Sequence, residues 1–285
     1  MNTFYCVTSD ITNVVNNPNF KLLKKACEEK GIPFVQLIAP ARGMLFADVP
    51  LLTEGGIYLL STTSSCFQYA FALIKKNPQI KTLYRQTISL YTPWHELISD
   101  ESANVPTIPA IYAPSEMVDD TLLQQIDDLL GGFPVILKRT GGSHGTGVIL
   151  IDSAISLKTA LPHIIQGRPE LFVLKKFITD AQNYRVIVLN DEVVGEMLYL
   201  PQAGDIRTNA VKVPAFEKSK ISDQWKNIAI KATQQKGMRF GGVDLLVDTK
   251  GDAYVAEVNT PCNFSRCQLL TGDPIAEQIV HDLCE

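Results

Sequence analysis

The sequence lacks a long apolar run and a basic leader. No stretch of its 285 residues approaches the roughly 20 apolar residues of a membrane span. The first ten residues contain no basic segment followed by an apolar one, so we expect no signal peptide. We therefore expect a cytoplasmic protein that does not act at a membrane.

Metal-binding cysteine patterns are also absent. Six cysteines occur without a Cys-x-x-Cys pair or histidines at zinc-ligand spacing, so we expect reduced thiols. Neither serine nor cysteine has an evident partner base for nucleophilic catalysis. Cys262 and Cys267 are the only thiols near the predicted site described below, and we do not expect them to be catalytic.

Positive charge is scarce as well. The net charge is -4, and lysine and arginine form no dense block, which argues against nucleic acid as the main partner. Hydrophobic and charged residues make up 46% and 20% of the chain, as in ordinary globular proteins. At this length we expect about two domains or more.

The first hundred residues alternate between strand-like and helix-like patterns. Apolar runs at 4–8, 34–38 and 57–60 predict buried strands, and 20–30 and 68–76 predict helices. This order predicts a parallel sheet. Because a Gly-x-Gly-x-x-Gly turn is missing, a dinucleotide site there has little support. A polar stretch over 99–109 predicts a domain boundary near residue 100.

A glycine cluster follows the apolar strand predicted at 133–138. The segment 138–148 reads Lys-Arg-Thr-Gly-Gly-Ser-His-Gly-Thr-Gly-Val and lies between two predicted strands, unlike a Walker loop. Such a loop can point backbone N–H groups and the Ser143 hydroxyl at phosphate oxygens, with Lys138 supplying a positive charge. A simple β-turn beside a surface lysine explains the segment equally well.

Two late strands carry acidic and amide side chains. Asp244 lies in the apolar run 243–247, and Glu257 and Asn259 are two residues apart, hence on one face of their strand. If the hairpin is symmetric about the turn at 248–252, Asp244 falls opposite Glu257. Facing carboxylates repel without a cation, and with Asn259 they form an oxygen set suited to Mg²⁺. The alternative is a pair of solvent-facing acids on an edge strand.

Arginine and amide residues lie between these two features, in Asn183-Tyr-Arg185 and in Arg207-Thr208-Asn209. Arg207 can fork onto phosphate or carboxylate oxygens with Asn209 beside it. Either arginine alone fits a surface ion pair as well. Together with the lysine, the glycine loop and the predicted metal set, they indicate a nucleoside triphosphate site.

From about residue 105 to the end, the chain resembles ATP-grasp carboxylate–amine ligases, particularly the RimK-like glutamate ligases. The matching segments are Pro-Val-Ile-Leu-Lys138, Gly-Ser-His-Gly-Thr-Gly-Val148, Gly-Asp-Ile-Arg-Thr-Asn209, Gly-Val-Asp244-Leu-Leu, Glu257-Val-Asn259 and Thr271-Gly-Asp-Pro-Ile-Ala276. The resemblance implies an α/β protein with an ATP-grasp fold, two α+β subdomains that clasp ATP, preceded by a Rossmann-like parallel α/β domain. We expect the N-terminal domain at 1–100, the central subdomain with the glycine loop at 101–175 and the C-terminal subdomain with the metal and substrate site at 176–285.

The resemblance also implies roles for individual residues. Those expected to bind ATP are Lys138, Gly142, Ser143, Gly145, Gly147, Lys176, Phe177, Asn183, Arg207, Thr208 and Asn209. Lys138, Arg207 and Asn209 would assist phosphoryl transfer, and Asp244, Glu257 and Asn259 would hold two Mg²⁺ ions, for which Mn²⁺ can substitute.

Three positions depart from the family pattern. Lys176 stands where an acidic or amide residue is frequent, and Asn183 where an aspartate usually binds the ribose. Pro261-Cys262-Asn263 replaces the commoner Pro-Gly after the metal-binding asparagine. We therefore expect altered nucleoside contacts and a substrate choice that can differ from the best-known members.

These observations predict an ATP-dependent ligase that forms ADP, phosphate and an acyl-phosphate intermediate. The substrates would be a small-molecule or peptide carboxylate and an amine-type acceptor, with thiol or hydroxyl acceptors left open. A phosphotransferase and a nucleotide-binding protein without turnover are the alternatives. We expect no nucleic-acid or membrane partner, and assembly into a homo-oligomer remains open.

Overall fold

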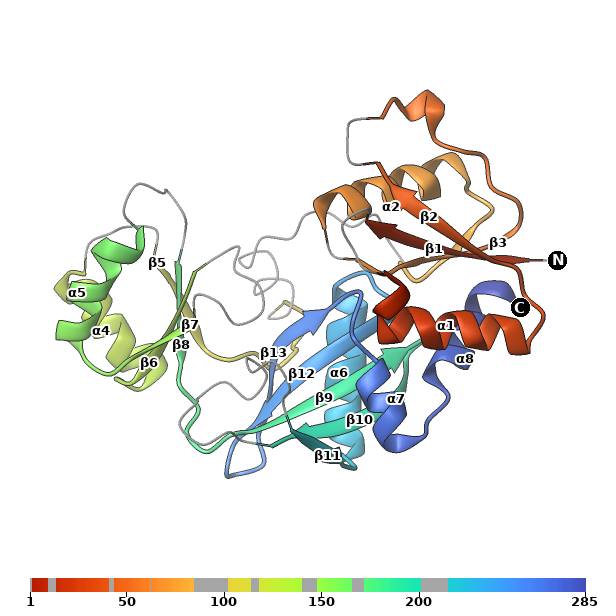
Figure 1. Cartoon of the computed structure of the whole chain (residues 1–285). Helices are drawn as coiled ribbons and strands as arrows, with labels where there is room; N and C mark the ends of the chain where they lie inside the picture. Colours follow the sequence, from red (N-terminus) through yellow and green to blue (C-terminus); the bar gives the residue numbers. More distant parts are fainter. Residues whose placement is uncertain are drawn as a thin grey trace.

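The computed structural model describes residues 2–9, 14–40, 44–61, 63–84, 102–113, 118–139, 148–165, 172–200 and 215–285. These residues form three sheets, which lie in three separate regions of the molecule (Figure 1). The described helices include none that is long and apolar enough to cross a membrane. All six cysteines are buried and unpaired, as expected of reduced thiols.

The N-terminal sheet is parallel, as its alternating pattern predicts, with strand order β2-β1-β3-β4. Its elements are β1 (Thr3–Ser9), η1 (Val14–Asn16), α1 (Pro18–Glu29), β2 (Phe34–Ala39), η2 (Phe46–Asp48), β3 (Gly55–Leu59), α2 (Ser64–Lys76) and β4 (Lys81–Thr82). Helix α1 begins with Pro18, and the Asn17 side chain caps it by accepting a hydrogen bond from the Phe20 N–H.

The central sheet is antiparallel, with strand order β5-β8-β6-β7. Its elements are β5 (Ala110–Ala113), α4 (Asp120–Gln125), η3 (Ile126–Leu130), β6 (Val135–Arg139), β7 (Val148–Ile151), α5 (Ala154–Ile165) and β8 (Phe172–Lys176). Helix α4 begins at Asp120, because the Asp119 side chain caps it by accepting a hydrogen bond from the Leu122 N–H.

The C-terminal sheet is antiparallel, with strand order β11-β10-β9-β12-β13. Its elements are β9 (Gln182–Leu189), β10 (Glu192–Tyr199), β11 (Phe216–Lys218), α6 (Asp223–Gln235), β12 (Phe240–Val247), β13 (Ala253–Asn259), α7 (Ser265–Thr271) and α8 (Ile275–Cys284). Asn190 and Asp191 have positive φ in the tight β9–β10 turn, a conformation that Asn and Asp adopt readily.

The buried apolar side chains form separate cores, of which one is confined to a single sheet and another spans two sheets. The core of the central sheet contains side chains from that sheet and its own helices. A second core joins the N-terminal sheet to the C-terminal one, because β1, β3, β9, β12 and the last two helices all contribute to it. Helices α1 and α8 accordingly lie side by side between these two sheets (Figure 1).

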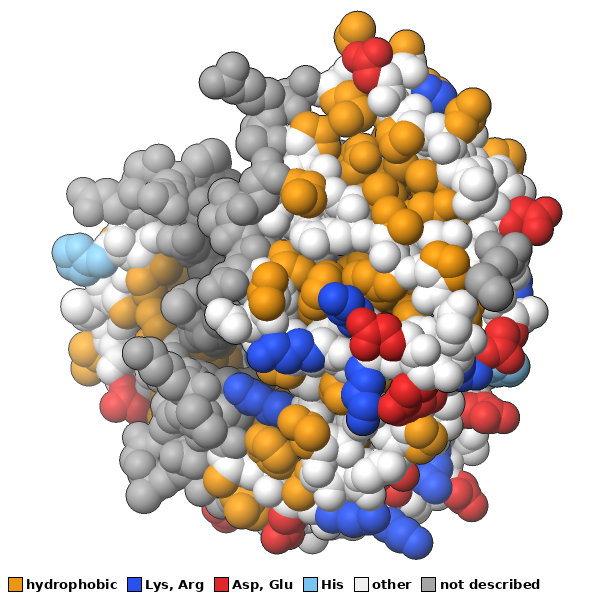
Figure 2. All heavy atoms as spheres, turned by 45° about the vertical axis from the view of Figure 1, so that its right-hand side comes forward, with side chains coloured by type: hydrophobic (Ala, Val, Ile, Leu, Met, Phe, Trp, Pro, Cys, Tyr) orange, Lys and Arg blue, Asp and Glu red, His pale blue; other side chains and the backbone are white. Residues whose placement is uncertain are grey.

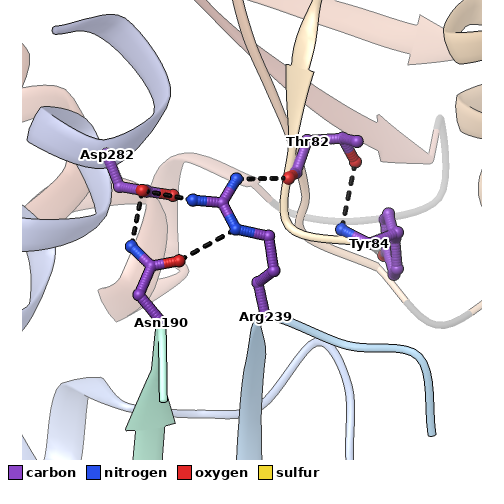
Figure 3. A network of polar contacts seen from close by, with 5 residues as sticks. All are labelled: Thr82, Tyr84, Asn190, Arg239 and Asp282. Atoms are coloured by element: carbon purple, nitrogen blue, oxygen red, sulfur yellow. Dashed lines mark hydrogen bonds and ion pairs between the residues drawn. The ribbon is translucent and has the colours of Figure 1, made fainter. Parts of the chain in front are cut away.

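Polar contacts strengthen the same junction. Arg239, at the start of β12, donates to the Thr82 carbonyl at 3.0 Å and the Asn190 side chain at 2.9 Å, and pairs with Asp282 of α8 (Figure 3). Figure 2 shows one face of the molecule, with apolar side chains gathered in its upper part and charged side chains of both signs below. Mixed charge on this face agrees with the lack of a basic block in the sequence.

Candidate functional site

The candidate site is centred on three neighbouring strands of the C-terminal sheet. Asp244 of β12 lies opposite Arg185 of β9 on one side and opposite Glu257 of β13 on the other. Directly opposed residues on neighbouring strands share a face of the sheet. This face is the one opposite α6, because Val243 and Leu245, on either side of Asp244, pack into the core that α6 covers.

Glu257 is opposite Asp244, as predicted, but symmetry about the turn is the wrong reason for it. Near the turn the pairing is symmetric, with Leu245 opposite Val255, which would put Ala256 opposite Asp244. The register then shifts by one residue and brings Glu257 there instead. Val255 and Val258 both pack toward α6, although they are three residues apart. The β-bulge between them therefore turns Glu257 and Asn259 to the Asp244 face.

Asp244 is held by a buried arginine. Arg185 Nε lies 2.7 Å from Asp244 Oδ1, and Arg185 Nη2 lies 3.0 Å from Oδ2, a two-pronged ion pair. Both residues are at least nine-tenths buried. The guanidinium also lies over the Tyr199 ring, 5.8 Å from its centroid.

Asn259 completes the set from the end of β13. Its side-chain Nδ2 donates to Asp244 Oδ2 at 3.2 Å and to the Gly242 carbonyl at 3.5 Å. Because the amide nitrogen makes both contacts, the carboxamide oxygen is the atom that can serve a cation. Glu257 is exposed, whereas Asp244 is buried, so the pair presents one solvent-facing and one buried carboxylate.

Burial and charge act in opposite directions on the central pair. Burial raises the pKa of Asp244, and the Arg185 guanidinium and the Asn259 amide oppose that rise. Burial works against the charge of Arg185, but the Asp244 carboxylate, with smaller contributions from Tyr199 and Cys262, outweighs it, so the arginine pKa is raised. Arg185 therefore remains a cation at any physiological pH.

The donor chemistry fits Mg²⁺. Two carboxylates and one carboxamide provide the oxygen ligands that this ion prefers, with room for phosphate oxygens and water. Arg185 uses one acceptor site on each Asp244 oxygen, and Asn259 uses the second site on Oδ2, so Oδ1 keeps an acceptor site for a cation. Among the residues described, no group of three or more His, Cys, Asp or Glu side chains is placed to hold a metal ion, so this set depends on the Asn259 amide as its third ligand.

The other expected site residues divide into two groups. Lys138 of β6 is half-buried and Lys176 at the end of β8 is exposed, both on the central sheet, and Phe177 directly follows β8. Asn183 is buried on β9, two residues before Arg185 and on the same face. Gly142, Ser143, Gly145, Gly147, Arg207, Thr208 and Asn209 lie outside the described residues.

Arg185 is the residue whose position the sequence does not predict. Its pattern allows a surface ion pair or an anion contact, whereas it lies buried against Asp244. The signal for this is the strand itself, since Tyr184-Arg-Val-Ile-Val-Leu189 is apolar apart from the arginine. A cation in a buried strand needs a partner there.

Comparison with protein families gives a match to the RimK-like ATP-grasp domain over residues 94–283. A probable alpha-L-glutamate ligase of Cellvibrio japonicus is 31% identical over 159 residues, which are 55% of this chain and 52% of that protein. A ribosomal protein bS6–L-glutamate ligase of Shigella boydii is 27% identical over 65% of this chain and 60% of that protein. The alignments thus span little more than half the length of these relatives.

Solved structures share the fold at low sequence identity. The ATP-grasp ligase PsnB in complex with its minimal precursor superposes with a TM-score of 0.74 at 15% identity, over 98% of this chain and 97% of that one. D-alanine–D-alanine ligase of Bacillus anthracis gives a TM-score of 0.74 at 13% identity, over 99% and 96%. With the family match over two thirds of its length, this chain belongs to the RimK-like ATP-grasp family.

Proposed function

We propose that this protein is an ATP-dependent ligase that joins a carboxylate to an amine. The observation that carries the proposal is the Asp244, Glu257 and Asn259 set on one face of the sheet, an oxygen-rich group suited to Mg²⁺ beside ATP phosphates. Membership of an ATP-grasp family and relatives named as glutamate ligases support it. The PsnB ligase has also been solved with Mg and ADP.

In the proposed reaction, a carboxylate oxygen attacks the γ-phosphorus of ATP, and the bond from that phosphorus to the β–γ bridging oxygen breaks to release ADP. The amine then attacks the carbonyl carbon of the acyl phosphate, loses a proton and displaces phosphate. The protein contributes position and charge, since no nucleophile of its own is required. Lys138 and Arg207 would face the phosphate oxygens, and Thr208 and Asn209 would contact the phosphoryl group that moves.

Two Mg²⁺ ions, or Mn²⁺ in their place, would be held by Asp244, Glu257 and Asn259 and would neutralise charge on the phosphates. Arg185 would act on Asp244, because its two-pronged contact fixes the plane of that carboxylate. The adenine and ribose would meet Lys176, Phe177 and Asn183, and the backbone and Ser143 of the glycine loop at 141–147 would hold phosphate.

The proposed substrates follow the named relatives. One relative is a ligase of L-glutamate and ribosomal protein bS6, and PsnB has been solved with a precursor peptide. We propose an amino acid such as glutamate as one substrate and a peptide, protein or small metabolite as the other. The departure at Pro261-Cys262-Asn263 favours a substrate different from those of the best-known members.

Trapping the intermediate tests the ligase assignment. With a carboxylate substrate, ATP and Mg²⁺ but no amine, hydroxylamine should intercept the acyl phosphate and give a hydroxamate in amounts matching ADP and phosphate. Glu257→Gln, which removes an exposed carboxylate and leaves the Arg185–Asp244 pair intact, should abolish this product. A stable phosphorylated product without hydroxamate would identify a phosphotransferase instead.

A further inference from the structure

The loop that follows Asn259 is packed tightly against the candidate site. It runs from Thr260 to Phe264 and leads into α7, and Cys262 in its middle is buried. A side chain at Gly242 would place its Cβ 2.6 Å from the Cys262 Cβ and 3.0 Å from Arg185 Nη1. Gly242 therefore lets the loop approach the arginine that holds Asp244.

One side chain of the N-terminal domain holds this loop from its other side. Asn19, in the first turn of α1, donates through Nδ2 to the Cys262 carbonyl at 3.1 Å. Its Oδ1 accepts from the Ser265 N–H at 3.0 Å, at the first residue of α7. Asn19 is only 7% exposed, so both contacts are made away from solvent.

We propose that Asn19 is a positioning residue through which the N-terminal domain sets the geometry of the metal site. This inference rests on the function proposed above. The amide fixes the Cys262 backbone, and the Cys262 side chain then packs against Gly242 beside Arg185. The same loop directly follows Asn259. Loss of the Asn19 contacts therefore removes the support of both Arg185 and Asn259.

The two halves of the amide have separable roles. The Oδ1 contact supplies an acceptor to the first N–H of α7, which no residue of that helix can provide. The Nδ2 contact reaches the loop itself and is the one that bears on the metal site. An aspartate at position 19 keeps the acceptor and loses the donor, whereas an alanine loses both.

Nucleotide binding at varied Mg²⁺ concentration measures the effect of Asn19 substitutions on the metal site, and it needs no carboxylate or amine substrate. Isothermal titration of ADP across a Mg²⁺ series gives an apparent Kd for the metal in each variant. Asn19→Ala and Asn19→Asp should both raise that Kd, by less than the roughly 10- to 100-fold loss that follows removal of a direct partner of a metal ligand, because Asn19 acts through the loop. Binding of ADP without Mg²⁺ should stay unchanged.

Asn17→Ala is the matched control, because it removes the α1 cap and touches neither Cys262 nor Ser265. It should lower the melting temperature as Asn19→Ala does, with the Mg²⁺ dependence of the wild type. Amide hydrogen exchange should show faster exchange at Ser265 in Asn19→Ala and protection retained in Asn19→Asp.

The outcomes separate the two proposals. Wild-type protein that binds ADP with no Mg²⁺ dependence would overturn the proposed function and this inference with it. Wild-type dependence that persists unchanged in both Asn19 variants, or is lost equally in Asn17→Ala, would overturn the inference alone.

Discussion

Arg185 and Asp244 are buried charges that depend on each other. Each would be costly in the interior alone, and their two-pronged contact, together with Asn259, supplies the compensation. Breaking such a pair leaves an uncompensated buried charge. Replacing both partners with apolar side chains of similar size removes that charge as well, so the two kinds of change should differ sharply.

A double-mutant cycle tests this dependence. Arg185→Leu alone should lower the free energy of unfolding by about 3–5 kcal/mol, because Asp244 then loses its counter-charge. Adding Asp244→Leu should restore part of that loss. Urea unfolding of the wild type, both single variants and the double variant provides the cycle. Additive losses in the double variant would show that the two charges are stabilised independently.

Single residues of the site could be predicted where a polar residue type stands in an otherwise apolar strand and suits one kind of ligand. Asp244, Glu257 and Asn259 stand out as acids and an amide in apolar strands, and the structure puts them on one face. Their exact pairing could not be derived from symmetry, because the bulge shifts it. The sequence does contain one sign of the bulge. Val255 and Val258 are three residues apart, although both pack toward α6.

At the scale of elements, α8 shows how closely a helix can approach a strand. A Cβ at Gly56 of β3 would lie 2.4 Å from the Leu283 Cβ and 2.5 Å from the Leu283 carbonyl oxygen. The obstacle includes backbone, which cannot rotate away. Helix α8 therefore packs directly on β3 because position 56 has no side chain.

Gly56→Ala should accordingly push α8 off β3 and lower the free energy of unfolding by about 1–3 kcal/mol or more. Gly241→Ala is the matched control, because the nearest neighbours of its Cβ would be side-chain atoms of Val258 and Thr233, at 3.2 to 3.5 Å. Those groups can shift, so its loss should be smaller. Equal losses in chemical denaturation would contradict the tight α8–β3 contact.

Most elements could be predicted from their patterns, and the exceptions have local causes. The parallel strand–helix alternation and the β9–β10 turn follow from period and turn residues. Strands β4 and β11, two and three residues long, are too short to show any period. The sequence does not predict helix α7 either, because its N-cap is Phe264 and the side chain bonded to its first N–H, Asn19, is distant in sequence.

At the scale of the whole molecule, the distribution of cores predicts which parts unfold together. Phe4 of β1, Tyr58 of β3 and Phe240 of β12 belong to one core, and the Tyr58 and Phe240 rings lie 6.1 Å apart. The Arg239 contacts in Figure 3 cross the same junction. The central sheet, with Leu137 in its own core, lies apart from this junction (Figure 1).

The N-terminal and C-terminal sheets should therefore open as one cooperative unit and the central sheet as another. Phe4→Ala should lower the opening free energy of amides in β1 and also in β9, which contributes Ile187 and Leu189 to the shared core. The cost should be about 3–5 kcal/mol at both strands.

Leu137→Ala should lower the opening free energy of amides in β6 and β8 and leave β1 and β9 unaffected. Native-state hydrogen exchange at rising denaturant resolves the strands separately. If Phe4→Ala destabilised β1 and left β9 unchanged, the shared core would not couple the two sheets, and polar contacts such as those of Asn19 and Arg239 would have to hold the N-terminal sheet to the site.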